Sequence, residues 1–146
     1  MSSATDSFCS PNSSIVDLWQ NDKPAARPSG QYEEEAFVSF ATKVIQDFAW
    51  NRKKSGDEDD GSRLFLYYAS HAPHTPMQVP QRLLDRLLAV NRSLHSGPSL
   101  TLPGLGYAAM VAVVDEAVAN LTQALKAADM WSSTLFVFQV SERVGE

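Results

Sequence analysis

Hydrophobic residues follow a helical period in three parts of the chain. Behind an acidic first turn at Glu33, apolar residues recur at steps of three and four until about Trp50, and the pattern returns at 81–90 and at 107–128. This spacing places the apolar side chains of each segment on one face. The sequence therefore predicts three amphipathic helices, of which the last is the longest.

Two short, continuous apolar runs lie at 64–69, with the sequence LFLYYA, and at 134–140, with the sequence TLFVFQV. Runs of this length and composition are typical of strands buried in a parallel sheet. Because a helical connection separates them, they predict a right-handed βαβ unit with parallel strands. The predicted fold class is therefore α/β with a parallel βαβ core. So few strands cannot cover both faces of a sheet, and we expect the chain to be part of a larger domain.

The other segments are predicted to be mostly loop. Residues 1–30 are rich in Ser, Asn, Asp and Pro, and only 15–19 alternates enough to form a short strand. Residues 51–62 carry a basic block and then an acidic block, which favours a solvated surface loop and leaves charge recognition as the alternative. Residues 92–105 are predicted to be loop from their Ser, Gly and Pro content.

Composition narrows the classes of partner. The chain has 146 residues, 44% of them hydrophobic, and a net charge of −5, which is typical of one globular domain and gives no electrostatic reason to bind nucleic acid. No stretch approaches the ~18 consecutive apolar residues of a membrane span, and the polar start predicts no signal peptide. The single cysteine, Cys9, excludes an internal disulfide and a cysteine-based zinc site.

The first apolar run leads directly into a loop that carries two histidines. Pro73 and Pro76 fix two φ angles and remove two backbone donors, so His71 and His74 cannot belong to a continuing strand or a regular helix. Ligands of open α/β sheets bind at the carboxyl ends of strands, which makes both histidines candidate site residues. From the residues alone, an exposed histidine in a proline-rich loop is the alternative. The prolines argue against a metal site formed by the two rings.

Three segments in order carry a family resemblance: FLYYASHAPHTPMQVP at 65–80, YAAMVAVVDEAVANLTQAL at 107–125 and MWSSTLFVF at 130–138. Together they resemble the sulfatase family, most closely its arylsulfatase B-like branch. The H-A-P-H-T-P-x-Q-V-P motif is the most specific part, and VDLWQNDKPA at 16–25 adds a weaker match. The resemblance predicts an N-terminal loop at 1–14, a partial sulfatase catalytic domain at 15–140 and an unrelated tail at 141–146.

This resemblance implies a fold and a chemistry. Sulfatases are alkaline-phosphatase-like α/β enzymes that hydrolyse sulfate esters with a formylglycine, made from the cysteine of a C-x-P-S-R motif, and a bound calcium ion. The sulfate-contacting histidine of the family falls on His74, which would bind sulfate and protonate the leaving group. His71 would be its neighbour in the substrate site. Sulfate ester substrates and a lysosomal or secreted location are likewise implied by the family.

The chain also departs from the family pattern. Cys9 begins a C-x-P sequence but lacks the following Ser-Arg, and it lies too close to the histidine loop to be the nucleophile. The aspartates that bind calcium in the family have no counterpart, so we expect no metal or cofactor on this chain alone. We therefore expect a sulfuric ester hydrolase by ancestry that is inactive as it stands. A truncated gene model or splice product of a longer sulfatase would explain these departures.

Three asparagines, Asn12, Asn91 and Asn120, fit the N-glycosylation pattern and are candidate glycosylation sites. The acidic residues Asp115 and Glu116 lie in the longest predicted helix, where solvation or capping is a better account than acid and base catalysis. Two alternative functions stay open. One is a non-catalytic interaction or decoy protein derived from a sulfatase, and the other is a phosphoester hydrolase of the alkaline-phosphatase-like superfamily.

Overall fold

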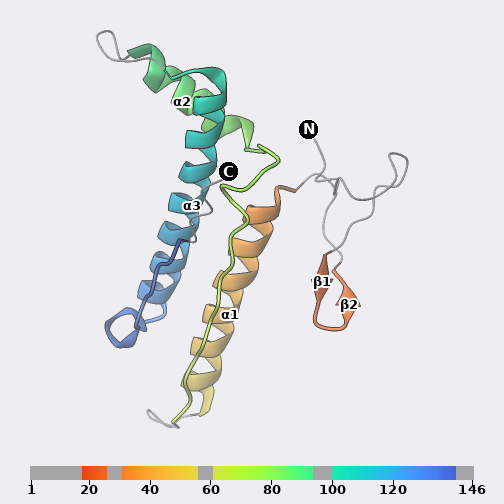
Figure 1. Cartoon of the computed structure of the whole chain (residues 1–146). Coiled ribbons are helices and arrows are strands. Elements are labelled where there is room, and N and C mark those ends of the chain that lie inside the picture. Colours follow the sequence, from red (N-terminus) through yellow and green to blue (C-terminus); the bar gives the residue numbers. More distant parts are fainter. Residues whose placement is uncertain (1–17, 26–30, 56–60, 94–99, 141–146) are drawn as a thin grey trace.

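The computed structural model describes residues 18–25, 31–55, 61–93 and 100–140. The interpretations of 1–14, 15–17, Cys9, Asn12 and 141–146 fall outside these residues. The elements, in chain order, are β1 (Trp19–Gln20), β2 (Lys23–Pro24), α1 (Glu33–Ser55), α2 (Gln81–Ser93), α3 (Leu102–Ala127) and the 3-10 helix η1 (Trp131–Ser133), as drawn in Figure 1.

The three predicted helices are confirmed, but three of their ends were wrong. α2 continues past Val90 to Ser93. α1 continues past Trp50 to Ser55, and the basic side chains of its last turn suit the negative end of the helix dipole. α3 begins at Leu102, inside the segment predicted to be loop. Its start is capped by Thr101, whose side chain accepts a hydrogen bond from the backbone of Gly104, and a proline occupies its first turn.

α3 is the central helix and packs on both other helices. Its C-terminal half faces α1, where the buried residues Ala41, Ile45, Leu121, Ala124 and Leu125 form one cluster. Its N-terminal half faces α2, where Leu83, Ala109 and Val113 form a second cluster. Figure 1 shows α2 beside the start of α3, with α1 further along the structure. Two small cores in a row therefore hold the described residues together.

α3 is also long and apolar enough to cross a membrane by length and composition. The expectation of no membrane span rested on the lack of an uninterrupted apolar run, and charged residues do interrupt this helix. Asp115 and Glu116 lie in the middle of this helix, where charges are costly in lipid. Within the described residues, 28% of its apolar window is buried, against α1 and α2.

The two apolar runs are extended, yet neither is assigned as a strand in the described residues. The only sheet found in this part of the chain is the antiparallel pair β1 and β2. The prediction that both runs are buried was wrong, because Phe65 is 90% exposed and Leu135 is 88% exposed. In the first run Leu64 and Tyr68 cover a helical surface, whereas every residue of the second run from 135 to 140 is exposed in the described residues.

The first run, 64–69, shows how this happens. Leu64 and Tyr68 pack against the cluster between α1 and α3, while Phe65 and Tyr67, on the opposite side of the extended backbone, face outward. Figure 1 shows 61–70 and 134–140 running in the same direction, opposite to the helices that precede them. A parallel βαβ pairing needs that direction. The alkaline-phosphatase-like fold class stays a prediction.

Candidate functional site

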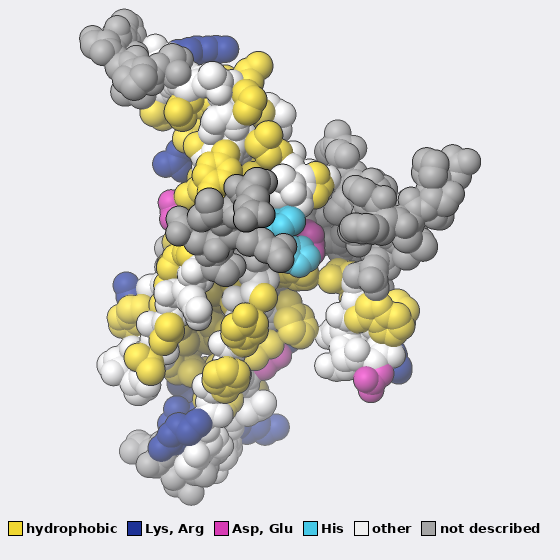
Figure 2. Space-filling view, in the orientation of Figure 1, with side chains coloured by type: hydrophobic (Ala, Val, Ile, Leu, Met, Phe, Trp, Pro, Cys, Tyr) yellow, Lys and Arg dark blue, Asp and Glu magenta, His cyan; other side chains and the backbone are white. Residues whose placement is uncertain are grey.

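The candidate site is the histidine loop, which we define as residues 71–76. It leaves the extended segment 61–70 and lies against the first turn of α1. The backbone N–H of His74 donates to the carbonyl of His71 at 2.8 Å, which closes a tight turn around Pro73. Both proline peptide bonds in the loop, Ala72-Pro73 and Thr75-Pro76, are cis. Figure 2 shows histidine side chains on the open surface of the molecule.

Glu34 anchors this loop through a buried carboxylate. The residue is only 3% exposed, and its Oε1 accepts hydrogen bonds from the backbone N–H groups of His71 at 2.7 Å and Ala72 at 3.4 Å. Its Oε2 accepts a hydrogen bond from the Tyr68 hydroxyl at 2.7 Å. A buried carboxylate is costly unless such donors surround it. Loss of any one of these hydrogen bonds would therefore leave the Glu34 carboxylate poorly compensated.

The Tyr68 hydroxyl responds to this environment. Burial raises the pKa of Tyr68 far above its usual range, and the hydrogen bond to the Glu34 carboxylate adds to the rise. Tyr68 therefore stays protonated and acts as a donor at any physiological pH. The neighbouring ring of Tyr67 points outward and makes no comparable contribution to the site.

His71 is tied at the edge of the loop by its side chain. Its Nδ1 lies 3.1 Å from Oε1 of Glu33, and its ring meets the Phe37 ring edge-on with 6.1 Å between the centroids. The side chain is nonetheless 73% exposed. His71 therefore contacts Glu33 and Phe37, whereas the His74 ring contacts the backbone of the loop.

His74 is exposed, and its ring is oriented by the backbone. Its Nδ1 lies 2.7 Å from the carbonyl oxygen of Thr75, so the proton of a neutral ring belongs on Nδ1 and Nε2 carries the lone pair. The ring does not enter a packed apolar interior. This arrangement leaves Nε2 to accept a hydrogen bond when the ring is neutral and to donate one when the ring is protonated.

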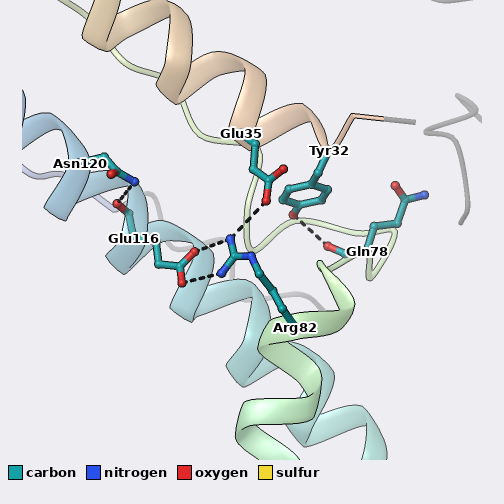
Figure 3. A network of polar contacts seen from close by, with 6 residues as sticks. All are labelled: Tyr32, Glu35, Gln78, Arg82, Glu116 and Asn120. Carbon is teal, nitrogen blue, oxygen red and sulfur yellow. Dashed lines mark hydrogen bonds and ion pairs between the residues drawn. The ribbon is translucent and has the colours of Figure 1, made fainter. Parts of the chain in front are cut away.

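A second polar group lies where α1, α2 and α3 meet (Figure 3). The guanidinium of Arg82 makes two hydrogen bonds of 2.7 Å to the carboxylate of Glu116 and one of 3.2 Å to Glu35. Asn120 donates to the backbone carbonyl of Glu116, and Tyr32 donates to that of Gln78. All of these residues except Gln78 border an open hollow of about 320 Å³.

Arg82 is shared between the carboxylates of Glu35 and Glu116. The hydrogen bonds to Arg82 lower the pKa of Glu116, and they raise the pKa of Arg82 further above its usual value. Burial, with the nearby glutamates, raises the pKa of Tyr32 to about 12. Asp115 is exposed, as predicted, and Glu116 is partly exposed; the bridge that Glu116 forms between α3 and α2 was not predicted. One guanidinium faces two carboxylates, so the group keeps a net negative charge and does not attract an anion such as sulfate.

The described residues do not fit the calcium ion that the sulfatase resemblance implies. Nowhere in 18–25, 31–55, 61–93 and 100–140 do three or more His, Cys, Asp or Glu side chains converge to hold a metal. Glu33 and Glu34 are instead engaged by His71 and by the loop backbone. No chemical step is therefore assigned to a metal on these residues.

Sequence interpretation missed the role of Glu34. It grouped Glu33, Glu34 and Glu35 as an acidic first turn, whereas the structure gives each a different partner. A signal was present, because Glu34 precedes Ala41 by one heptad and therefore falls on the buried face of α1. Arg82 and Glu116 carried no such signal, since their pairing depends on how α2 crosses α3.

Comparison with known proteins supports a distant relationship. The chain is 26% identical over 130 residues to arylsulfatase J of the mouse, Mus musculus, an alignment that covers 88% of the chain and 19% of that relative. The chain thus spans about a fifth of the length of this curated relative. No protein-family model matches the chain. No solved structure matches it. The similarity indicates a sulfatase-like relationship, and the arylsulfatase B-like branch stays a prediction.

Proposed function

We propose that this chain is part of a sulfatase-like domain and carries its sulfate-contacting loop, with His74 as the residue that binds the sulfate group. The observation that carries the proposal is the exposed His74 ring, oriented by Thr75 on a loop that Glu34 anchors. The distant similarity to an arylsulfatase supports the choice of sulfate as ligand. The alkaline-phosphatase-like α/β fold belongs to the same proposal.

The chemistry follows from the two ring nitrogens. With Nδ1–H donating to the Thr75 carbonyl, a protonated ring presents Nε2–H outward as a charge-assisted donor to a sulfate oxygen. In a complete sulfatase site the same N–H could pass its proton to the leaving oxygen. His71, held by Glu33 at its side, would border the bound anion rather than replace His74.

We propose binding without turnover for this chain alone. The family's formylglycine motif and its paired calcium-binding aspartates have no counterpart in the sequence. Without a nucleophile, a histidine that polarises sulfate has no bond-forming partner. Purified chain should therefore leave an aryl sulfate such as p-nitrophenyl sulfate intact, with or without calcium. Release of p-nitrophenol above that of a buffer blank would contradict this part of the proposal.

The binding part is tested by titrating ¹⁵N-labelled chain with inorganic sulfate at mildly acidic pH and following the imidazole nitrogens. We expect a saturable shift of the His74 ring signals and of the backbone amides of the histidine loop, and the shift of the loop amides should be lost in His74→Gln. His95→Gln removes the histidine outside the loop motif and is the matched control, with the titration of His74 unchanged. Equal responses of His74→Gln and wild type would overturn the assignment of His74.

A second candidate, a non-catalytic interaction protein, is favoured by the outward-facing side chains of the two extended runs. Phe65, Tyr67, Leu135 and Val137 are all strongly exposed. Such segments could add to the sheet of a sulfatase-like partner. Sedimentation of the chain with a full-length arylsulfatase distinguishes the candidates: a complex lost in Phe65→Ser would favour the interaction protein.

Location and glycosylation remain proposals. A lysosomal or secreted location would expose Asn91 and Asn120 to glycosylation. Asn120 is exposed, while the Asn91 side chain accepts a hydrogen bond from the backbone of Leu100 at 2.9 Å. A mobility shift after deglycosylation of the chain from secreting cells, absent in Asn120→Gln, tests the more accessible site.

A further inference from the structure

We propose that Glu34 is the positioning residue of the histidine loop: its buried carboxylate fixes the His71 and Ala72 peptides and thereby sets where the His74 ring stands. This inference rests on the proposed sulfate binding of His74 for its functional meaning. It concerns a residue outside the H-A-P-H-T-P motif, thirty-seven positions before His71 in the chain.

The first step is the bond between α1 and the loop. Oε1 of Glu34 accepts from two consecutive peptide N–H groups, those of His71 and Ala72, at 2.7 and 3.4 Å. Two adjacent donors on one oxygen restrain both the place and the orientation of that stretch of backbone. The acceptor is itself held, because Glu34 lies in the first turn of α1 and is almost fully buried.

The second step carries this restraint to the ring. Glu34 holds the N–H of His71. The carbonyl of the same residue accepts a hydrogen bond from the N–H of His74 at 2.8 Å. The His74 ring is then fixed by its Nδ1 contact with the Thr75 carbonyl. Glu34, the 71–74 turn and the imidazole thus form one continuous series of hydrogen bonds, in which Glu34 does not touch the anion itself.

The sign of the charge effect separates positioning from simple electrostatics. Removing a nearby carboxylate should strengthen the binding of an anion if only Coulomb forces act. Removing the anchor of the loop should weaken it, because a donor displaced by about 1 Å loses most of its directed contact. Glu34→Ala therefore distinguishes the two by direction and not merely by size.

The experiment compares Glu34→Ala, Glu34→Gln and the control Glu35→Ala by sulfate titration of the full chain, with helical content checked by circular dichroism. Glu35 lies on the same turn but contacts Arg82 instead of the loop. We expect Glu34→Ala to bind sulfate about fivefold or more weakly, and Glu34→Gln, whose amide oxygen can still accept, to retain most of the affinity. Glu35→Ala should bind equally or slightly more tightly.

Amide hydrogen exchange supplies a readout that is independent of sulfate. In Glu34→Ala the His71, Ala72 and His74 amides should exchange about tenfold faster or more, while the helical amides of α3 keep their protection. If Glu34→Ala does not fold, amide exchange in Glu34→Gln tests the positioning role instead. A neutral amide oxygen accepts more weakly than a carboxylate, so the His71 and Ala72 amides should exchange about twofold to threefold faster than in Glu35→Ala.

The outcomes are distinguishable. Wild-type chain that shows no sulfate response at His74 removes the proposed function, and exchange of the loop amides still decides the positioning role. Wild-type binding with unchanged or tighter binding in a folded Glu34→Ala overturns the positioning role and leaves the proposed function intact. Unchanged exchange of the His71 and Ala72 amides in that variant overturns it as well.

Discussion

The Tyr68 hydroxyl donates to Oε2 of Glu34 at 2.7 Å, joining the extended segment before the histidine loop to the first turn of α1. This bond completes the set of donors around a carboxylate that is buried from water. Residues thirty-four positions apart in the chain are thereby held in one place. The stability of this contact can be measured without any ligand.

Removing the hydroxyl should destabilise the fold measurably. Tyr68→Phe leaves the Glu34 carboxylate with one donor fewer, and we expect the free energy of unfolding to fall by about 1–2 kcal/mol. Tyr67→Phe is the matched control, because its ring is 81% exposed, and it should change stability by less than about 0.5 kcal/mol. Urea unfolding followed by circular dichroism measures both. Equal effects would show that the buried bond adds nothing.

Stability should also fall at alkaline pH because of this residue. Burial raises the pKa of Tyr68 above its unfolded value of 10, so above pH 10 the folded chain retains a proton that the unfolded chain releases. The contribution is fully present below pH 10 and is lost as the pH rises further. Urea midpoints between pH 9 and about 11 should fall less steeply in Tyr68→Phe than in wild type. Parallel curves would contradict the prediction.

The Arg82–Glu116 pair should couple α2 to α3 with modest strength. Both side chains are more than one third exposed, so solvent screening limits the coupling to about 0.5–1 kcal/mol despite the two-bond geometry. A double-mutant cycle of Arg82→Met and Glu116→Gln measures it. Lys43→Met, which removes an exposed pair with Asp47 within α1, is the control for losing a surface charge.

The same pair should weaken in acid. The hydrogen bonds from Arg82 lower the pKa of Glu116, so its stabilising contribution is present above its unfolded value, 4.5, and is lost as the pH falls through the folded value. The coupling energy from the cycle should therefore be smaller at about pH 3 than at pH 7. A coupling that grows in acid would exclude the ion pair as its source.

Exposed apolar side chains of the extended runs should promote self-association. Phe65→Ser and Val137→Ser remove strongly exposed side chains and should leave the unfolding free energy within about 0.5 kcal/mol. They should lower the fraction of oligomer seen by sedimentation velocity, because exposed apolar edges pair with other chains. Ile45→Ala, at a buried position, should instead cost about 2–4 kcal/mol.

Helical periodicity was sufficient to predict α1, α2 and α3, because each buries one face against a neighbour. Their ends were less predictable: Thr101 and Pro103 form a capped start that was read as loop from its composition. The capping residues were visible in the sequence, and the helix forms despite Gly104 and Gly106 in its first turns. For α1, basic residues after Trp50 favoured continuation where a loop was expected.

The extended runs could not be predicted correctly from composition alone. A run such as 64–69 looks buried on both sides, yet a strand is buried only where other strands and layers cover it. In the described residues Leu64 and Tyr68 find a helical surface and Phe65 does not. The histidine loop was located from its prolines, while its anchor at Glu34 depended on a tertiary contact.

The histidine loop joins the two halves of the interior. Tyr68, before the loop, packs on the cluster between α1 and α3, and Ala72, within it, packs on the cluster between α2 and α3. A ligand that binds the ordered loop would therefore stabilise both clusters. Its binding should raise the melting temperature by the same amount whether unfolding is followed by a probe in α1 or by one in α2.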